Sequence, residues 1–293
     1  MDARDLKIFE AVARLGSMNR AAADLHTVQS NVTARIRLLE EELGASLFER
    51  SRRGVQLTAA GRRLLPYARN VAALIADARR AVADDGTPRG ALAVGSLETT
   101  AAVRLAPILA RFAAAYPEVD LSLVTGTTAE LTERVLRHEI EGAFVCGPLD
   151  HPELEGDVVF REELALATAG SVSSLDALLR RGEPRIVVLR AGGSYRQRLE
   201  AILARRGAIA LRRLEFGTID GILGCVAAGL GVTLLPKAMV SERWRAAGVK
   251  LHALPAREAN VETLFIARRD TFRSSALAAF LDVARPPRRQ AAE

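Results

Sequence analysis

A run of polar side chains without an acidic member lies between residues 29 and 37 of the chain. Its members are hydrogen-bonding residues and cations: Gln29, Ser30, Asn31, Thr33, Arg35 and Arg37. Asn and Gln can form paired hydrogen bonds with adenine, while Ser, Thr and Arg can reach bases or phosphates. Acidic side chains begin only at Glu40. The pattern predicts a helix that meets DNA with its N-terminal end.

A dense cationic cluster follows at Arg50, Arg52 and Arg53. The short apolar pieces on either side, 47–48 and 55–57, are typical of a β-hairpin with the cations at its tip. Such a tip binds the phosphate backbone of any sequence, with a strong dependence on salt. An isolated cluster of this kind is more often a solvated loop, but its place directly after the polar helix favours a DNA contact.

A second set of candidates consists of polar side chains placed where predicted strands end and helices begin. They are Ser96, Glu98, Thr99, Thr100, Thr127, Thr128, Ser194, Tyr195 and Thr218. Hydroxyls and helix N-termini can bind a small polar effector, and the same residues can be ordinary helix caps. Glu98 argues against a purely anionic ligand, unless Arg190 or Arg196 offsets its charge.

Metal and catalytic chemistry are not indicated, and no cofactor is expected. The four histidines lie far apart, without the i, i+3 or i, i+4 spacing of paired ligands. Cys146 and Cys225 stand in apolar segments and are predicted to be buried structural thiols, with a redox sensor as the alternative. Gly229-Leu230-Gly231 precedes a predicted strand, so it is not a nucleotide-binding fingerprint.

Three helices must position the polar run at 29–37. Apolar periodicity predicts helices over 2–15, 17–25 and 27–43, with Ser17 and Thr27 as N-caps of the second and third. The last two are joined by a tight turn at His26-Thr27 and form a helix-turn-helix, whose second helix enters the major groove.

A longer helix follows over 59–84, with Thr58 as its N-cap. Its apolar residues are spaced 4-3-4-3-4: Leu64, Ala68, Val71, Ile75, Ala78 and Val82. That spacing predicts a coiled coil between two copies of the chain. Packing of this helix on its own domain is the alternative.

Beyond a polar Gly/Pro-bearing linker at 84–90, strands and helices alternate. Strands are predicted at 92–95, 119–124, 142–146, 164–168, 186–190, 211–216, 232–235 and 263–267. Helices are predicted at 100–116, 128–138, 175–181, 194–206, 219–228 and 275–283. The alternation indicates a parallel sheet covered by helices, in two sets with a cleft between them.

The N-terminal segment resembles the winged helix-turn-helix of LysR-type transcriptional regulators. The resemblance rests on AVARLGSMNRAAADLHTVQSNVTARIRLLEEELGASLFER and RGVQLTAAGRRLLPYA. It continues, less densely, through RLAPILARFAAAYPEVDLSLVTGTTAELTERVL and TIDGILGCVAAGLGVTLLP, and covers about residues 3–285. Most members carry Ser, Pro and Arg where Val28, Ser30 and Ala34 stand here. The operator preference of other members therefore does not transfer.

The resemblance implies a mixed fold. An all-α-type winged helix-turn-helix at 1–58 is followed by a dimerisation helix and hinge at 59–88. A two-lobed α/β domain like periplasmic binding proteins follows at 89–293. Lobe I is predicted at 89–163 and 268–293, and lobe II at 164–267. The implied partners are double-stranded DNA with an interrupted two-fold operator, a small effector between the lobes, and further copies in a homodimer or homotetramer.

Composition agrees with a globular protein of this size. Of 293 residues, 49% are hydrophobic and 26% charged, with a net charge of +6. No apolar run is long enough to span a membrane, and MDARDLKIFE is not a signal peptide. A cytoplasmic, nucleoid-associated, non-enzymatic regulator is expected. An enzyme of the two-lobed fold and a ligand-free DNA-architectural protein are the alternatives: the first does not need the winged helix, and the second does not need the cleft.

Overall fold

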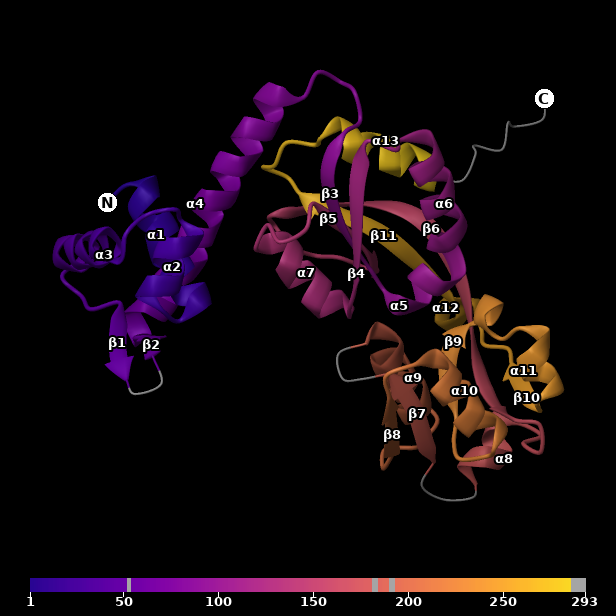
Figure 1. The fold of residues 1–293 in the computed structure, drawn as a ribbon. Helices are drawn as coiled ribbons and strands as arrows, with labels where there is room; N and C mark the ends of the chain where they lie inside the picture. The colour runs from indigo at the N-terminus through magenta and orange to yellow at the C-terminus, as the bar shows by residue number, and fades with distance from the viewer. Residues whose placement is uncertain (52–53, 181–183, 190–192, 286–293) are drawn as a thin grey trace. The chain divides into compact units, whose positions relative to one another are not determined.

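The computed structural model describes residues 1–51, 54–180, 184–189 and 193–285 (Figure 1). By its internal contacts the chain divides into two compact units. The N-terminal unit comprises Met1–Gly86 with Thr271–Ser274, and the C-terminal unit comprises Thr87–Asp270 and the chain from Ser275 onward. The main change from one unit to the other falls inside the polar linker at 84–90.

In the N-terminal unit, three helices precede a hairpin and a long helix. They are α1 (Ala3–Leu15), α2 (Met18–Asp24), α3 (Gln29–Leu43), β1 (Phe48–Ser51), β2 (Gly54–Leu57) and α4 (Ala59–Ala83). Helices α2 and α4 begin as predicted, because Ser17 and Thr58 accept hydrogen bonds from first-turn N–H groups. The start of α3 differs. Val28 occupies its N-cap position without a side-chain bond, since its carbonyl accepts the first helical hydrogen bond, from the N–H of Val32. Thr27 lies one position before it, and its hydroxyl accepts from the Asn31 side-chain amide at 3.0 Å.

One apolar core holds this unit together. Phe9 of α1 packs with Val32, Ile36 and Leu39 of α3, all of them buried. Gly61 lets α4 approach the hairpin closely, since a Cβ there would lie 2.2 Å from the carbonyl oxygen of Leu47. The helix-turn-helix is therefore fixed against both the hairpin and α4.

The strands of the C-terminal unit are β3 (Gly90–Ser96), β4 (Val119–Thr125), β5 (Gly142–Cys146), β6 (Leu154–Ala169), β7 (Arg185–Leu189), β8 (Arg212–Phe216), β9 (Thr233–Pro236), β10 (Val249–His252) and β11 (Asn260–Arg268). Its helices are α5 (Glu98–Thr100), a π-helical turn (Ala101–Leu105), α6 (Ala106–Ala115), α7 (Thr128–Leu136), α8 (Leu175–Leu179), α9 (Ser194–Ala204), α10 (Ile219–Ala227), a 3-10 turn (Lys237–Met239), α11 (Glu242–Ala246), α12 (Ala256–Ala259) and α13 (Ser275–Ala284).

The sheets are mixed, and the prediction of a parallel sheet was incomplete. β3 is parallel to β4 and β5, and β7 is parallel to β8. β6, however, is antiparallel to β9, β10 and β11. β11 comes from late in the chain, lies between β5 and β6 and is antiparallel to both, an insertion that the order of elements along the sequence does not indicate.

Two lobes share the long strand β6. Its first half pairs with β11, beside β5, β3 and β4, and these strands form lobe I. Its second half pairs with β9 and β10, which belong to lobe II together with β7 and β8. The boundary predicted at residue 268, where the chain passes from lobe II back to lobe I, differs from the structure. The chain is already in lobe I at Asn260, because β11 (Asn260–Arg268) pairs with β5 and β6.

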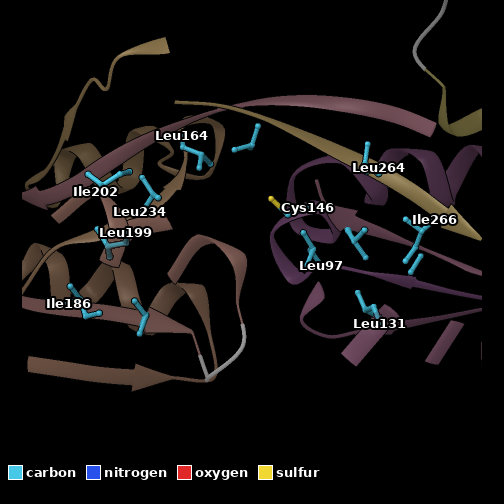
Figure 2. Packing of buried hydrophobic residues seen from close by; sticks show 14 of the residues in the cluster. Leu97, Leu131, Cys146, Leu164, Ile186, Leu199, Ile202, Leu234, Leu264 and Ile266 are labelled. Carbon is cyan, nitrogen blue, oxygen red and sulfur yellow. The ribbon is translucent and has the colours of Figure 1, made fainter. Parts of the chain in front are cut away.

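Buried apolar residues from both lobes form one continuous cluster (Figure 2). Leu97 and Leu131 enter it from lobe I, while Ile186, Leu199 and Leu234 enter it from lobe II. Within the described residues, none of the helices combines the length and the apolar character needed to cross a membrane.

Candidate nucleic-acid interface and ligand cleft

One side of α3 is polar and faces away from the core. Positions 29, 33 and 37, and next to them 30 and 34, recur at helical spacing. The residues on this face are Gln29, Ser30, Thr33, Ala34 and Arg37. All are exposed except Thr33, which is half-buried. This face fits the surface that a helix presents to a major groove.

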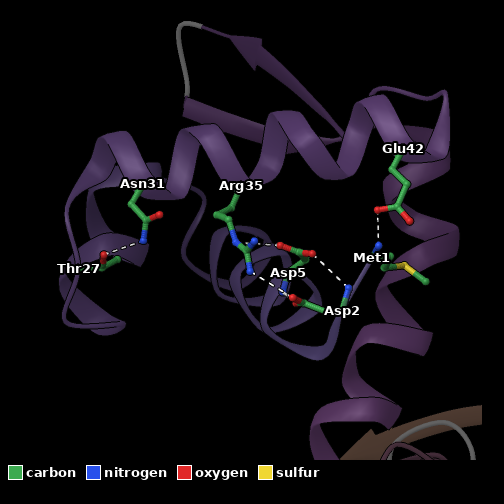
Figure 3. A network of polar contacts seen from close by, with 7 residues as sticks. All are labelled: Met1, Asp2, Asp5, Thr27, Asn31, Arg35 and Glu42. Carbon is green, nitrogen blue, oxygen red and sulfur yellow. Dashed lines mark hydrogen bonds and ion pairs between the residues drawn. The ribbon is translucent and has the colours of Figure 1, made fainter.

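Two residues predicted to contact DNA lie off this face (Figure 3). Arg35 pairs with Asp5 at 3.0 Å and with Asp2 at 3.3 Å, at the N-terminal end of α1. The side-chain amide of Asn31 donates to Thr27. Both side chains thus hold α3 within its own domain, because helical rotation turns positions 31 and 35 away from positions 29, 33 and 37.

The β1–β2 hairpin is anchored by an acidic residue of α3. The carboxylate of Glu40 accepts hydrogen bonds from the backbone N–H groups of Leu47 and Phe48, at 2.6 and 3.1 Å. Glu40 therefore positions the hairpin beside the polar face of α3. Arg52, Arg53 and the Arg50 side chain, predicted as phosphate contacts, lie outside the described residues.

The apolar seam of α4 divides into two halves. The first half packs on the core of its own unit: Leu64, Ala68 and Val71. The second half is exposed: Ile75, Ala78 and Val82. Val82 is 90% exposed and the neighbouring Leu74 is 60% exposed. Packing on its own domain thus accounts for the first half of the helix, while pairing with a second copy stays a prediction for the second half.

A cleft of about 290 Å³ lies between the lobes of the C-terminal unit. Lobe I contributes residues from the end of β4, the start of α5 and the start of α7. Lobe II contributes residues from the ends of β7 and β8, the start of α9, and strand β9. These are the carboxyl ends of parallel strands and the N-termini of helices, where open α/β folds bind ligands.

The structure brings together five of the nine predicted contact residues. Glu98, Thr99, Thr127, Ser194 and Tyr195 line the cleft. Thr128 lies beside it, with its hydroxyl 2.9 Å from that of Ser194 in the opposite lobe.

The other three predicted contacts are not among the described lining residues. Ser96 and Thr100 are buried within lobe I. Thr218 caps α10 by accepting from Gly221. Thr127 also has a capping role, since it forms a capping box with Glu130 at the start of α7. The cap interpretation therefore accounts for Thr218 fully and for Thr127 in part.

Sequence reasoning missed several lining residues. They include Thr125, Glu130, Leu189, Phe216, Ile222, Thr233, Leu234 and Leu235. Thr125, Leu189 and Phe216 end parallel strands, and the same rule that selected Thr127 could have identified them. Strand β9 faces the cleft only because it pairs with β6, and no local pattern indicates this pairing.

Two buried ionisable groups are held neutral: Tyr195, which lines the cleft, and Cys146, at the end of β5. Burial raises the pKa of the Tyr195 phenol, so its hydroxyl stays protonated and can donate a hydrogen bond to a ligand. Burial also raises the pKa of the Cys146 thiol, against the opposing effect of Arg198. A protonated, buried thiol is a poor nucleophile, which favours the structural role predicted for Cys146. Among the described residues, no group of His, Cys, Asp and Glu side chains is arranged to hold a metal ion.

Comparisons with known proteins place both units in one family. The model "Bacterial regulatory helix-turn-helix protein, lysR family" matches residues 3–62, and "LysR substrate binding domain" matches residues 85–286. The chain is 43% identical over 282 residues to the HTH-type transcriptional regulator YusT of Bacillus subtilis, covering 96% of this chain and 95% of YusT. It is 40% identical over 281 residues to the regulator GltR of the same organism, with coverage of 96% and 95%.

A solved structure agrees with this assignment. Full-length CbnR, in complex with its target DNA, is 27% identical, with coverage of 97% of this chain and 99% of CbnR and a TM-score of 0.63. These relatives are regulators, which decides against the enzymatic and architectural alternatives. The chain has a DNA-binding unit and an effector-binding unit, and it belongs to the LysR family of transcriptional regulators.

Proposed function

We propose that this regulator responds to a small polar metabolite bound in the cleft between its two lobes. The observation that carries the proposal is the cleft itself, whose walls come from both lobes and include hydroxyls and helix N-termini. A ligand that touches both lobes favours the arrangement in which both contacts are made. Its binding therefore shifts the protein between two states of different activity on DNA.

On the DNA side, we propose that the chain acts as a homodimer on an interrupted two-fold operator. The polar face of α3 supplies the base contacts, and the β1–β2 hairpin supplies phosphate contacts. The exposed half of the α4 seam supports pairing with a second copy, since Ile75, Ala78 and Val82 are apolar and uncovered. Assembly of two dimers into a tetramer is the further step proposed for this chain.

The test is a footprint of the full chain on the DNA upstream of its own gene, titrated with candidate metabolites. Thr99→Val and Thr233→Val remove one hydroxyl from each wall and keep the side-chain shape. Both Thr99 and Thr233 are almost fully buried and line the cleft. Each variant should bind the operator normally and need about five- to tenfold more metabolite, because one hydrogen bond contributes about 1 kcal/mol.

Thr100→Val is the matched control, because Thr100 is equally buried but does not line the cleft. It should respond at the wild-type concentration. A metabolite whose effect is weakened by Thr100→Val, and not by Thr99→Val or Thr233→Val, would place the effector site elsewhere.

A further inference from the structure

The charged side chains that line the cleft do not balance one another. Among the described residues they are Glu98, Glu130 and Arg196. The remaining lining residues carry hydroxyl or apolar side chains, or are glycines. The chemical class of the ligand then depends on whether Arg196 can offset the two carboxylates.

Arg196 is engaged within lobe II. Its Nε lies 3.1 Å from Glu200 and its Nη1 lies 2.7 Å from Glu215. The Arg196 side chain is only 15% exposed. Two carboxylates therefore already compensate this cation, and it does not offset Glu98 across the cleft.

Glu130 adds a second negative charge to the cleft wall. Its carboxylate accepts a hydrogen bond from the backbone N–H of Thr127 at 2.8 Å. That bond holds the pKa of Glu130 below its usual range, so Glu130 is ionised at neutral pH.

Glu98 is half-buried in the first turn of α5, at the cleft surface. Its carboxylate has no hydrogen bond or ion pair with any other residue in the described ranges 1–51, 54–180, 184–189 and 193–285. Within the described ranges, two cations act near these carboxylates: Arg196, which is paired inside lobe II, and Arg134, which favours the charged form of Glu130. Neither pairs with Glu98. An anionic ligand would therefore be repelled by the half-buried Glu98 carboxylate, whereas a cationic ligand would be attracted to it.

We infer that the cleft takes a ligand with a positively charged nitrogen, an ammonium or guanidinium group, which Glu98 binds. This inference rests on the proposed role of the cleft as the effector site. The rest of the ligand is partly apolar, because Leu199, Phe216, Ile222 and Leu234 form much of the opposite wall. A cleft of about 290 Å³ admits a small metabolite.

Matched probes of opposite charge test the inference on the full chain. 2-Phenylethylamine is compared with 3-phenylpropanoate, and 1,5-diaminopentane with glutarate, by thermal denaturation and calorimetry. The amines should raise the melting temperature and the carboxylates should not. Glu98→Gln keeps the size of the side chain and should weaken amine binding about tenfold, the value of one charge-assisted hydrogen bond. Glu118→Gln, at an exposed position before β4, should leave amine binding unchanged.

Other outcomes would overturn the inference in distinguishable ways. Amine binding that is unchanged in Glu98→Gln would remove Glu98 as the counter-ion. Carboxylate binding that is lost in Arg190→Gln would assign the cleft to an anion, while leaving it as the effector site. If none of the four probes binds, both the ligand class and the cleft as a small-molecule site are overturned.

Discussion

Arg35 and Arg37 lie two positions apart on α3, yet helical geometry sends their side chains to different surroundings. The Arg35 side chain is 29% exposed and pairs with Asp2 and Asp5. The Arg37 side chain is 80% exposed and pairs with Glu41, one helical turn further on. Arg35 therefore joins α3 to α1, while Arg37 stays at the surface that faces outward.

Replacing Arg35 by Ala should destabilise the N-terminal unit. Asp5 keeps a side chain that is only 12% exposed, and its carboxylate would lose the paired cation. The expected loss is about 1–2 kcal/mol, between the values for buried and exposed pairs. Arg37→Ala should cost less than about 0.5 kcal/mol, as is usual for an exposed pair. Urea denaturation of the two variants measures both values. Equal losses would show that the Arg35 network adds no stability.

At the scale of elements, α3 and the hairpin should contribute differently to DNA binding. Gln29→Ala should change which bases are preferred, because Gln29 lies on the exposed polar face of α3. Arg52→Ala with Arg53→Ala should weaken binding to every sequence and flatten the salt dependence by about one unit per lost phosphate contact. Binding titrations on several operators at several salt concentrations separate the two effects. A double variant that binds as well as wild type at moderate salt would remove the hairpin from the interface.

The exposed half of α4 predicts where two copies meet. Ile75→Asp should abolish the dimer, because two like charges would face each other in a desolvated contact, at a cost of several kcal/mol. Ala76→Asp is the control, since Ala76 is exposed next to the seam but not on it. Sedimentation should show a monomer for the first variant and a dimer for the second. A dimer that persists in Ile75→Asp would locate the contact elsewhere.

Much of the element order follows from local signals. Ser17 and Thr58 cap their helices where predicted, and β5 spans the predicted residues 142–146. The first half of β6 was missed, because its sequence LEGDVVFREE mixes charged and apolar residues without regular alternation. Its strand conformation depends on pairing with β11, which lies far away in the sequence. Local patterns do not contain that information.

The residues of the candidate sites were also predictable only where local signals indicate them. Rules for strand ends and helix starts selected Thr99, Thr127 and Ser194 correctly as lining residues. Position alone did not separate Thr99 from Thr100, because the two differ only in the direction of their side chains. Arg35 was assigned to DNA because its partners Asp2 and Asp5 lie at the N-terminal end of α1, some thirty residues earlier, and meet it only once α1 and α3 are packed. Asn31 differs, because its partner Thr27 lies only four residues away and the local spacing could have indicated the pair.

At the scale of the whole molecule, lobe II is an insertion into lobe I. The chain leaves lobe I along β6 and returns along β11, and Glu163 faces Asn260 in the register of these two strands. The points of exit and return are therefore neighbours in one sheet. Two adjacent strands carry the connection between the lobes, which suits a movement that opens and closes the cleft around them.

The central place of β11 also affects how the protein is made. Since β11 lies between β5 and β6, lobe I cannot complete its sheet on the ribosome until all of lobe II has been synthesised. Until then, the apolar edge of β5 has no partner on that side, and such edges promote aggregation. A chain stopped at residue 254, before β11, should accumulate in inclusion bodies, whereas one stopped at residue 285 should not. If both chains are recovered equally in the soluble fraction of the cell lysate, lobe I folds without β11.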